Sequence, residues 1–445
     1  MTLRVIAILA IAIVGCLVSL RKPFWGLLLL VFWYFFRPDM WGAEAWLRPT
    51  QWWSVAVFVG WLLFDRASEH NFRRTGWIVL LMAAMTLSAA FAPLSDAESF
   101  ERLWLIVKIL IIVFLIVKLC NTPQRLAYLT LTILAGILWV SKAVMVHWAQ
   151  AGLTMTRIDV PVAQGGGANY TCFLFLATLP WLILGLYRRA RWQKLLALLC
   201  VPIWLLVFVA TGSRGGFLAL LATMLALLVV QRRLGVYAVG AACALGFLLL
   251  APSAYWQRMS TITTEKTKMD VSELGRWQNI QISLDIIRDY PMLGVGLSKF
   301  PQAALKYMPQ EYAAVRGVSV AHNTYLQMGA ETGLLVLGVF LMTTWALMWR
   351  LLRWRSPADM PGRATFEFVR QGLIAGLAGT LTSALFIDAV GLDFFWWLYG
   401  LGFACVRVLE RQRALAAAPA RRSPEAGDKH APVAPIPLAP RGSEG

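Results

Sequence analysis

Long apolar runs constrain this chain more than any other feature of its sequence. The runs are roughly 17–25 residues long, which is the length that an α-helix needs to cross a bilayer core. Of the 445 residues, 59% are hydrophobic and only 14% are charged, and a soluble protein of this length could not keep so much apolar surface away from water. A membrane β-barrel would instead show short segments of alternating polarity. The sequence therefore predicts an all-α polytopic membrane protein.

The apolar runs also predict how the chain is organised. The first two runs are short and only three residues apart, so one of them can be re-entrant or interfacial, which leaves about 12 transmembrane helices. We expect N-terminal membrane helices in 1–251, an extracytoplasmic loop domain in 252–321, C-terminal membrane helices in 322–413, and a disordered cytoplasmic tail in 414–445. The thirteen candidate segments are 3–20, 24–36, 51–64, 76–92, 103–120, 126–148, 169–187, 193–210, 214–230, 235–251, 322–349, 368–388 and 392–409.

Charge predicts the orientation of these helices. The net charge of +18 at first suggests nucleic acid, but Lys and Arg cluster in short loops between the apolar runs, as cytoplasmic loops of membrane proteins do. We therefore expect no nucleic-acid partner. The basic loops are 188–194, 231–233, 350–356 and 407–413. Counting outward from them places the 149–168 loop, the turn at Arg214 and the long 252–321 segment on the opposite side of the membrane.

The 252–321 segment contains a predicted amphipathic helix at 273–290. The apolar residues Trp277, Ile280, Leu284 and Ile287 recur at helical spacing and are expected to form its apolar stripe. The glycines of PMLGVG (291–296) are expected to end the helix. Such a helix can lie on the membrane surface or cover a cavity.

One turn contains an arginine on the side of the membrane where arginine is disfavoured. In VFVATGSRGGFLAL (207–220), the apolar residues stop at Thr211 and resume at Phe217. Arg214 can be a loop residue whose charged end reaches the membrane surface. We favour a functional role, because arginines at a membrane edge usually have a partner. A guanidinium beside the N–H groups of glycines suits a diphosphate.

Arg276 begins the predicted loop helix on the same side of the membrane as Arg214. It can be an exposed charge beside Glu273, three residues away on a helix. Together with Arg214 it can instead form a two-pronged clamp for phosphate groups.

His322 marks the point where the chain re-enters the membrane, in SVAHNTYLQMGAETGLLVLGVFL (319–341). It can cap the helix or lie at the interface, or it can act as a general base or donate a hydrogen bond to a phosphate. Neighbouring arginines and partial burial are expected to lower its pKa and keep it neutral. His322 and Asn323 are expected to point to different helix faces from Glu331, so we assign no triad.

The glycine-rich stretch TRIDVPVAQGGGANYT (156–171) precedes another membrane segment on the same side. Its N–H groups can hold an anion at the start of a helix, but such a stretch is more often a flexible turn, the interpretation that we favour slightly. Arg157 is a third and weaker phosphate-binding candidate. The sequence contains no Walker loop, Asp-rich cluster, His-Glu zinc motif or Gly-x-Ser-x-Gly elbow, so it predicts no metal site.

Three motifs in the same order resemble those of the O-antigen ligase superfamily, which also contains O-antigen polymerases and bacterial O-oligosaccharyltransferases. The motifs are TGSRGGFLAL (211–220), GRWQNIQISLDIIRDYPMLGVGLSKF (275–300) and AHNTYLQMGAETGLLVLG (321–338). They combine a Ser-Arg-Gly turn, a large loop and a His-Asn pair at helix re-entry. The N-terminal LRKPFWGLLLLVFWYFFRPDMWG (20–42) also resembles the O-glycosylation ligases linked to exosortase systems.

The resemblance implies a fold of about twelve membrane helices with a periplasmic loop domain. It implies a multi-pass protein of the bacterial inner membrane, surrounded by membrane lipids, with its active site facing the periplasm. The implied reaction transfers a glycan from undecaprenyl diphosphate to an acceptor hydroxyl, which in ligases belongs to a sugar of lipid A-core, without a metal or other cofactor. Carried over by motif, Arg214 and Arg276 bind the diphosphate and His322 is the catalytic histidine, while Arg157 and Asn323 are further substrate-binding candidates.

Elementary chemistry agrees with these implied roles. A diphosphate leaving group accumulates negative charge as the glycosidic bond breaks, and arginines can stabilise that charge. The acceptor hydroxyl must lose a proton, which a histidine can take.

Two alternatives remain open at this stage. A lipid-linked glycan transporter also binds lipid diphosphates with arginines, but it is expected to show internal repeats or paired broken helices, and the candidate residues here lie on one face. An O-antigen polymerase or a protein O-oligosaccharyltransferase differs from a ligase only in its acceptor, which a single sequence does not determine.

Overall fold

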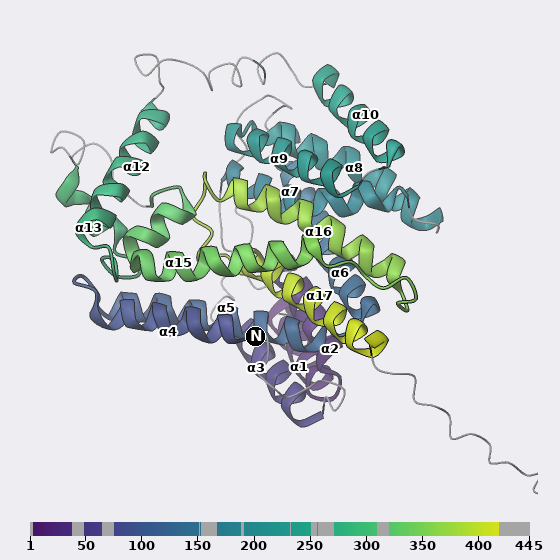
Figure 1. The fold of residues 1–445 in the computed structure, drawn as a ribbon, viewed down its shortest axis with the longest axis horizontal. Helices are drawn as coiled ribbons and strands as arrows, with labels where there is room; N and C mark the ends of the chain where they lie inside the picture. The colour runs from purple at the N-terminus through teal and green to yellow at the C-terminus, as the bar shows by residue number, and fades with distance from the viewer. Residues whose placement is uncertain are drawn as a thin grey trace, which may run out of the picture.

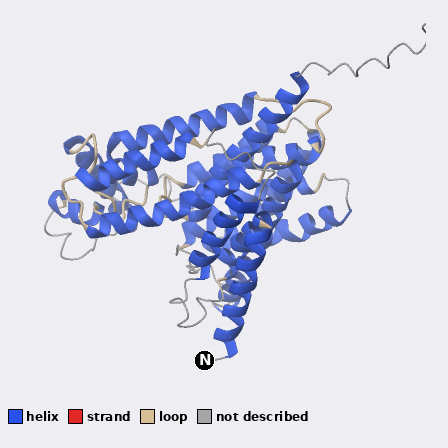
Figure 2. Ribbon diagram, turned by 90° about the horizontal axis from the view of Figure 1, so that it is seen from below, coloured by secondary structure: helices blue, strands red, loops and turns tan. Residues whose placement is uncertain are grey.

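The computed structural model describes residues 3–37, 49–64, 75–150, 152, 167–187, 191–231, 233–250, 256, 271–308 and 320–417, and in these ranges it contains helices and no strand (Figures 1 and 2). The helices are α1 (Leu3–Arg21), α2 (Pro23–Phe36), α3 (Pro49–Phe64), α4 (Gly76–Phe91), α5 (Ala97–Leu119), α6 (Pro123–Gln150), α7 (Ala168–Gly185), α8 (Arg191–Thr211), α9 (Arg214–Val230), α10 (Leu234–Leu250), α12 (Val271–Asp289), α13 (Phe300–Tyr307), α15 (Thr324–Arg353), α16 (Arg363–Ser383) and α17 (Asp393–Ala417).

The apolar runs of the sequence correspond to helices. Each of the thirteen predicted segments coincides with a helix, and α9 has the predicted bounds. The all-α prediction is therefore confirmed for the described residues. Four helices are long and apolar enough to cross a membrane: Pro123–Gln150, Ala168–Gly185, Arg191–Thr211 and Thr324–Arg353. Several other apolar helices are shorter, so the number of about 12 transmembrane helices stays a prediction.

Glycines on α16 allow three helices to approach one another closely. A Cβ atom on Gly376 would lie 2.3 Å from the carbonyl oxygen of Ala177 on α7, and one on Gly379 would lie 1.9 Å from the hydroxyl of Thr223 on α9. Small residues spaced in this way are typical of helix packing in membranes. As a result, α16 packs against both α7 and α9 along its length (Figure 1).

The predicted loop helix is α12, and its buried face overlaps the predicted apolar stripe only in part. Trp277 and Leu284, which we placed on the apolar stripe, are 40% and 52% exposed. Ile282 and Ile286 are buried and pack with residues of α13 and α15, and Ile287 of the predicted stripe is partly buried against the same cluster. The sequence of α12 has apolar residues on two faces, and tertiary packing against α15 selects one of them. The other face leaves an aromatic and an aliphatic side chain exposed.

The segment after α12 is fixed to a bend in α15. Gly333, inside α15, has φ 75° and ψ 175°, so the helix changes direction there. At this bend the N–H of Leu334 donates to the carbonyl of Pro291 at 2.7 Å, and the N–H of Val295 donates to the carbonyl of Ala330 at 2.9 Å. The left-handed φ of 67° at Gly294 brings the two backbones into contact. The loop helices α12 and α13 are thereby held at the first half of α15 (Figure 1).

Candidate functional site

The turn that contains Arg214 is built around a helix cap. The Ser213 hydroxyl accepts a hydrogen bond from the N–H of Gly216 at 2.9 Å and donates one to the side-chain oxygen of Asn169 at 2.6 Å. Ser213 is therefore the N-cap of α9, and Arg214 is its first residue. Arg214 is half-buried. A guanidinium at the N-terminus of a helix adds its charge to the positive end of the helix dipole, which suits an anionic group.

The glycines after Arg214 have a packing role that the sequence did not reveal. A Cβ atom on Gly215 would lie 2.5 Å from the ring of Phe386, and one on Gly216 would lie 2.7 Å from the sulfur of Cys172. Because Gly215 and Gly216 have no side chains, the start of α9 packs closely against Phe386 and against α7.

The turn that contains His322 precedes a second helix cap. The Asn323 side-chain oxygen accepts hydrogen bonds from the N–H groups of Tyr325 and Leu326, at 3.0 and 3.1 Å, and so caps α15. His322 has φ 55°, which is rare for a residue with a side chain. It is exposed and lies outside the helix. The cap is thus Asn323 and not His322.

One loop joins these two turns. The connecting loop, residues 384–392 between α16 and α17, accepts a hydrogen bond at the carbonyl of Phe386 from the Asn169 amide at 3.2 Å. The next carbonyl, that of Ile387, accepts one from the Thr324 hydroxyl at 2.8 Å. The Thr324 oxygen also accepts from the N–H of Ala389 at 3.0 Å. Consecutive residues of this loop therefore hold the Arg214 turn and the His322 turn, which are distant in sequence.

Arg276 is connected to the same region through α12. The Asn279 amide, one helical turn after Arg276, donates to the carbonyl of Val320 at 3.1 Å. Val320 lies two residues before His322, so α12 is docked onto the segment that leads into the His322 turn. Arg276 is half-buried. The structure thus joins the elements that carry the three predicted catalytic residues through a short series of contacts.

A carboxylate that the sequence analysis missed lies near His322. Burial raises the pKa of Asp388, while the charges of Arg102 and His322 and the N–H of Val390 act in the opposite direction. The guanidinium of Arg102 lies 3.7 Å from the Asp388 carboxylate. His322 therefore has an acidic neighbour that the sequence did not predict. Asp388 gave no sequence signal, because it follows an apolar stretch and precedes the next helix without a motif.

Two further predictions concern Glu331 and Arg157. The Glu331 carboxylate accepts hydrogen bonds from the amide of Gln327 at 2.6 Å and from the N–H of Phe300 at 3.3 Å. Glu331 therefore stabilises the contact between α15 and the start of α13. Arg157 lies outside the described residues. The 156–171 stretch also contains Asn169, however, and that residue contacts the Arg214 turn.

Comparison with known proteins agrees with the motifs. Residues 195–341 match a family model described as O-antigen ligase. The matched range begins in α8 and ends in α15, and it contains Arg214, Arg276 and His322. A search of curated proteins found no match. Over residues 195–341 the chain is therefore similar to the O-antigen ligase family, and its apolar helices together with this match support a multi-pass membrane protein.

Proposed function

We propose that this protein is a ligase-type glycosyltransferase that moves a glycan from undecaprenyl diphosphate to an acceptor hydroxyl, a lipid A-core sugar, on the periplasmic face of the bacterial inner membrane. The observation that carries the proposal is the connecting loop, which holds the Arg214 turn and the His322 turn at consecutive residues. The match to the O-antigen ligase family model supports a glycosyltransferase of the ligase or polymerase type.

In the proposed reaction, the acceptor oxygen attacks the anomeric carbon of the first sugar. His322 takes the proton of the acceptor hydroxyl, and the bond between the anomeric carbon and the diphosphate oxygen breaks. The diphosphate leaves with the bonding electrons, and Arg214 and Arg276 stabilise the negative charge that gathers on it. Asp388, as a neighbour of His322, stabilises the imidazolium that forms. Arg157 and Asn323 are further proposed contacts to the donor.

The test is a reconstituted assay with one labelled glycan on undecaprenyl diphosphate. Separate reactions offer lipid A-core, a second lipid-linked glycan, or a pilin-like protein as the acceptor, each with and without a chelator. The proposal expects covalent transfer to lipid A-core that the chelator does not reduce. Transfer to the lipid-linked glycan alone would identify a polymerase, and transfer to the protein alone an O-oligosaccharyltransferase.

A transporter gives a different result in the same vesicles. It would move the labelled donor across the bilayer without forming a covalent product with any acceptor. Glycan found only on undecaprenyl diphosphate, together with translocation of that donor, would therefore contradict the proposal. An Arg288→Ala variant is a suitable control, because this exposed arginine lies on α12 beyond the proposed site.

A further inference from the structure

A cavity of about 950 Å³ lies at the other ends of the helices that carry the proposed active site. Its lining includes the last residues of α9 and the first half of α16, whereas Arg214 lies at the start of α9 and the connecting loop follows the end of α16. The 17 residues of α9 correspond to about 25 Å. The cavity is therefore separate from the site described above.

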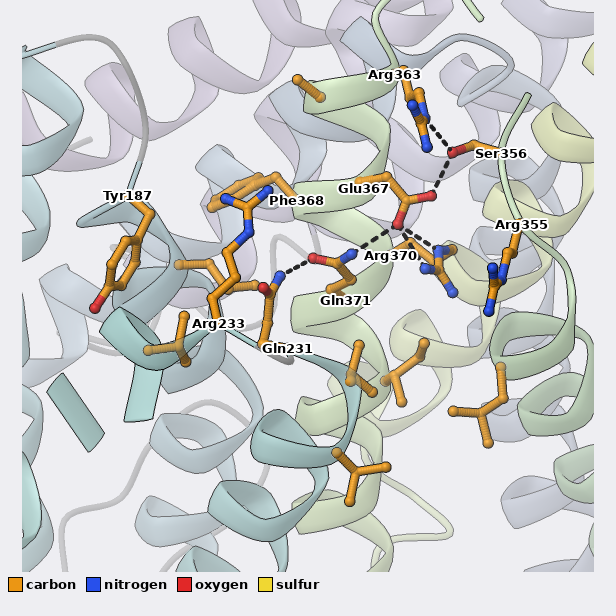
Figure 3. Close-up of a pocket in the computed structure, with 17 residues that line it drawn as sticks. Tyr187, Gln231, Arg233, Arg355, Ser356, Arg363, Glu367, Phe368, Arg370 and Gln371 are labelled. Carbon is orange, nitrogen blue, oxygen red and sulfur yellow. Dashed lines mark hydrogen bonds and ion pairs between the residues drawn. The ribbon is translucent and has the colours of Figure 1, made fainter. Parts of the chain in front are cut away.

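A hydrogen-bond network around one carboxylate forms part of the cavity lining (Figure 3). Glu367 accepts from the Ser356 hydroxyl at 2.6 Å, from the guanidinium of Arg370 at 2.6 Å and from the amide of Gln371 at 2.9 Å. Gln371 in turn accepts from the amide of Gln231, which links α16 to the end of α9. Arg370 is buried and neutralises Glu367.

Three more arginines line the cavity, and none of them has a carboxylate partner among the described residues. They are Arg233, Arg355 and Arg363. All three are exposed, and Arg363 contacts the network only through the Ser356 hydroxyl at 3.2 Å. In Figure 3, Arg233 and Arg355 lie on opposite sides of the Glu367 network. Because Arg370 compensates Glu367, these three guanidiniums leave the cavity with an excess of positive charge.

The remaining lining is largely apolar, and it comes from five helices and their ends, including Val236 of α10. It includes Leu184 of α7, Val229 and Val230 of α9, Leu352 of α15, and Phe368 and Ile374 of α16. A space that combines apolar walls with several guanidiniums suits a molecule with an anionic head and an apolar tail. Guanidiniums bind phosphate oxygens through paired N–H groups.

From this arrangement we propose that the cavity binds a phosphate-bearing anion, and that its source is the headgroup of an anionic membrane lipid. The apolar walls favour a lipid over a free phosphate ion, because a free ion would leave them in contact with water. Arginines near a membrane surface can also attract anionic lipids without any defined site. The experiment must therefore distinguish lipid binding in the cavity from attraction of lipids by surface charge.

The test uses the purified full-length protein in a neutral detergent, with lipid binding followed by native mass spectrometry. The probes are phosphatidylglycerol and phosphatidylcholine with the same acyl chains. The cavity variant replaces Arg233, Arg355 and Arg363 with Gln. The matched control replaces Arg350, Arg353 and Arg413 with Gln, which removes the same charge from the same end of the molecule but from residues outside the cavity lining.

The proposal expects the native protein to prefer phosphatidylglycerol and the cavity variant to bind it at least about tenfold more weakly. The control variant should bind it within about twofold of the native protein. Equal losses in the two variants, or equal binding of the two lipids by the native protein, would overturn the proposal. Thermal unfolding checks that both variants remain folded. Ala364→Trp, which adds bulk to the cavity lining without changing charge, should also weaken binding.

Inorganic phosphate and inorganic diphosphate distinguish the two sources of a phosphate group. If the anion comes from a lipid, neither ion should raise the unfolding temperature of the lipid-free protein, and neither should displace phosphatidylglycerol. Stabilisation by either ion that is lost in the cavity variant but kept in the control would support the phosphate site and refute the lipid source.

Discussion

At the scale of single residues, substitutions of Arg214 show whether this residue binds phosphate or anchors the turn in the membrane. It is the first residue of α9 and follows the Ser213 cap. Lysine keeps a cation at this position but loses the planar fork of the guanidinium. We expect Arg214→Ala to lower the transfer rate by about 10²–10³-fold and Arg214→Lys to give an intermediate rate, at equal amounts of membrane protein. Full activity of the Lys variant would indicate an anchoring role instead.

A substitution of His322 shows whether this residue acts as a general base or binds the phosphate. Glutamine can donate a hydrogen bond but cannot accept the proton of the acceptor hydroxyl. We therefore expect His322→Gln to lower turnover by about 10²–10⁴-fold while leaving the affinity for the lipid-diphosphate donor unchanged. Donor binding and turnover are measured on the same preparation. If affinity and turnover fall together, His322 binds phosphate, and near-native turnover would exclude the base role.

At the scale of elements, the bend of α15 positions the His322 turn. Gly333 has φ 75°, and a Cβ atom there would lie 2.1 Å from the carbonyl oxygen of Met292. A side chain at such a φ costs about 1–3 kcal/mol before any clash. We expect Gly333→Ala to lower the unfolding temperature and the activity. Gly338→Ala on the same helix is the matched control, because its Cβ atom would meet nothing within 4 Å. Equal behaviour of the two variants would contradict this role for the bend.

The start of α5 is joined to the segment before α13 by a buried ammonium. The Lys299 side chain is fully buried and lies 2.8 Å from the Asp96 carboxylate and 2.6 Å from that of Glu98. Burial alone would lower the pKa of Lys299, but the hydrogen bonds and charges of the two carboxylates raise it. The hydrogen bond from Lys299 lowers the pKa of Asp96.

The pH dependence of stability follows from the direction of the Asp96 shift. A carboxyl whose pKa is lower in the folded state stabilises the fold above its unfolded pKa of about 3.9, and this contribution is lost as the pH falls through the folded pKa. We expect Asp96→Asn, which keeps the helix cap, to lower the unfolding temperature at pH 7. The difference from the native protein should shrink below about pH 4. Asp359→Asn, at an exposed loop position, is the control, and a difference that persists in acid would refute the role of the charge.

At the scale of the whole molecule, the sequence predicted the helices well and the contacts between them poorly. Apolar runs alone placed α9 and the twelve other apolar helices, because length and hydrophobicity determine where such helices form. Periodicity placed Trp277 and Leu284 on the buried face of α12 although both are exposed, because α12 is apolar on two sides and packing decides between them. The connecting loop could not be predicted either, since it acts largely through the backbone carbonyls of Phe386 and Ile387, which carry no residue-specific signal.

The orientation of the molecule in the membrane is the last prediction. The 30 residues of α15 correspond to about 45 Å, more than the thickness of a bilayer core. The helix ends in Arg350 and Arg353, which we expect in the cytoplasm, so α13 should lie on the periplasmic side and the loop before α16 on the cytoplasmic side. In a variant without native cysteines, we expect a cysteine at Gln302, on α13, to react with an impermeant maleimide in intact spheroplasts.

A cysteine at Asp359 should react with the same reagent only after the membrane is opened. Both positions are exposed on the protein, so a difference in labelling reports the membrane and not burial. Labelling of both positions in intact spheroplasts would show that α15 does not cross the bilayer. The reverse pattern would place the Arg214 and His322 turns in the cytoplasm, where a periplasmic acceptor could not reach them, and would refute the proposed ligase reaction. The expected pattern places the arginine-lined cavity at the inner leaflet, beside the anionic lipids that we propose it binds.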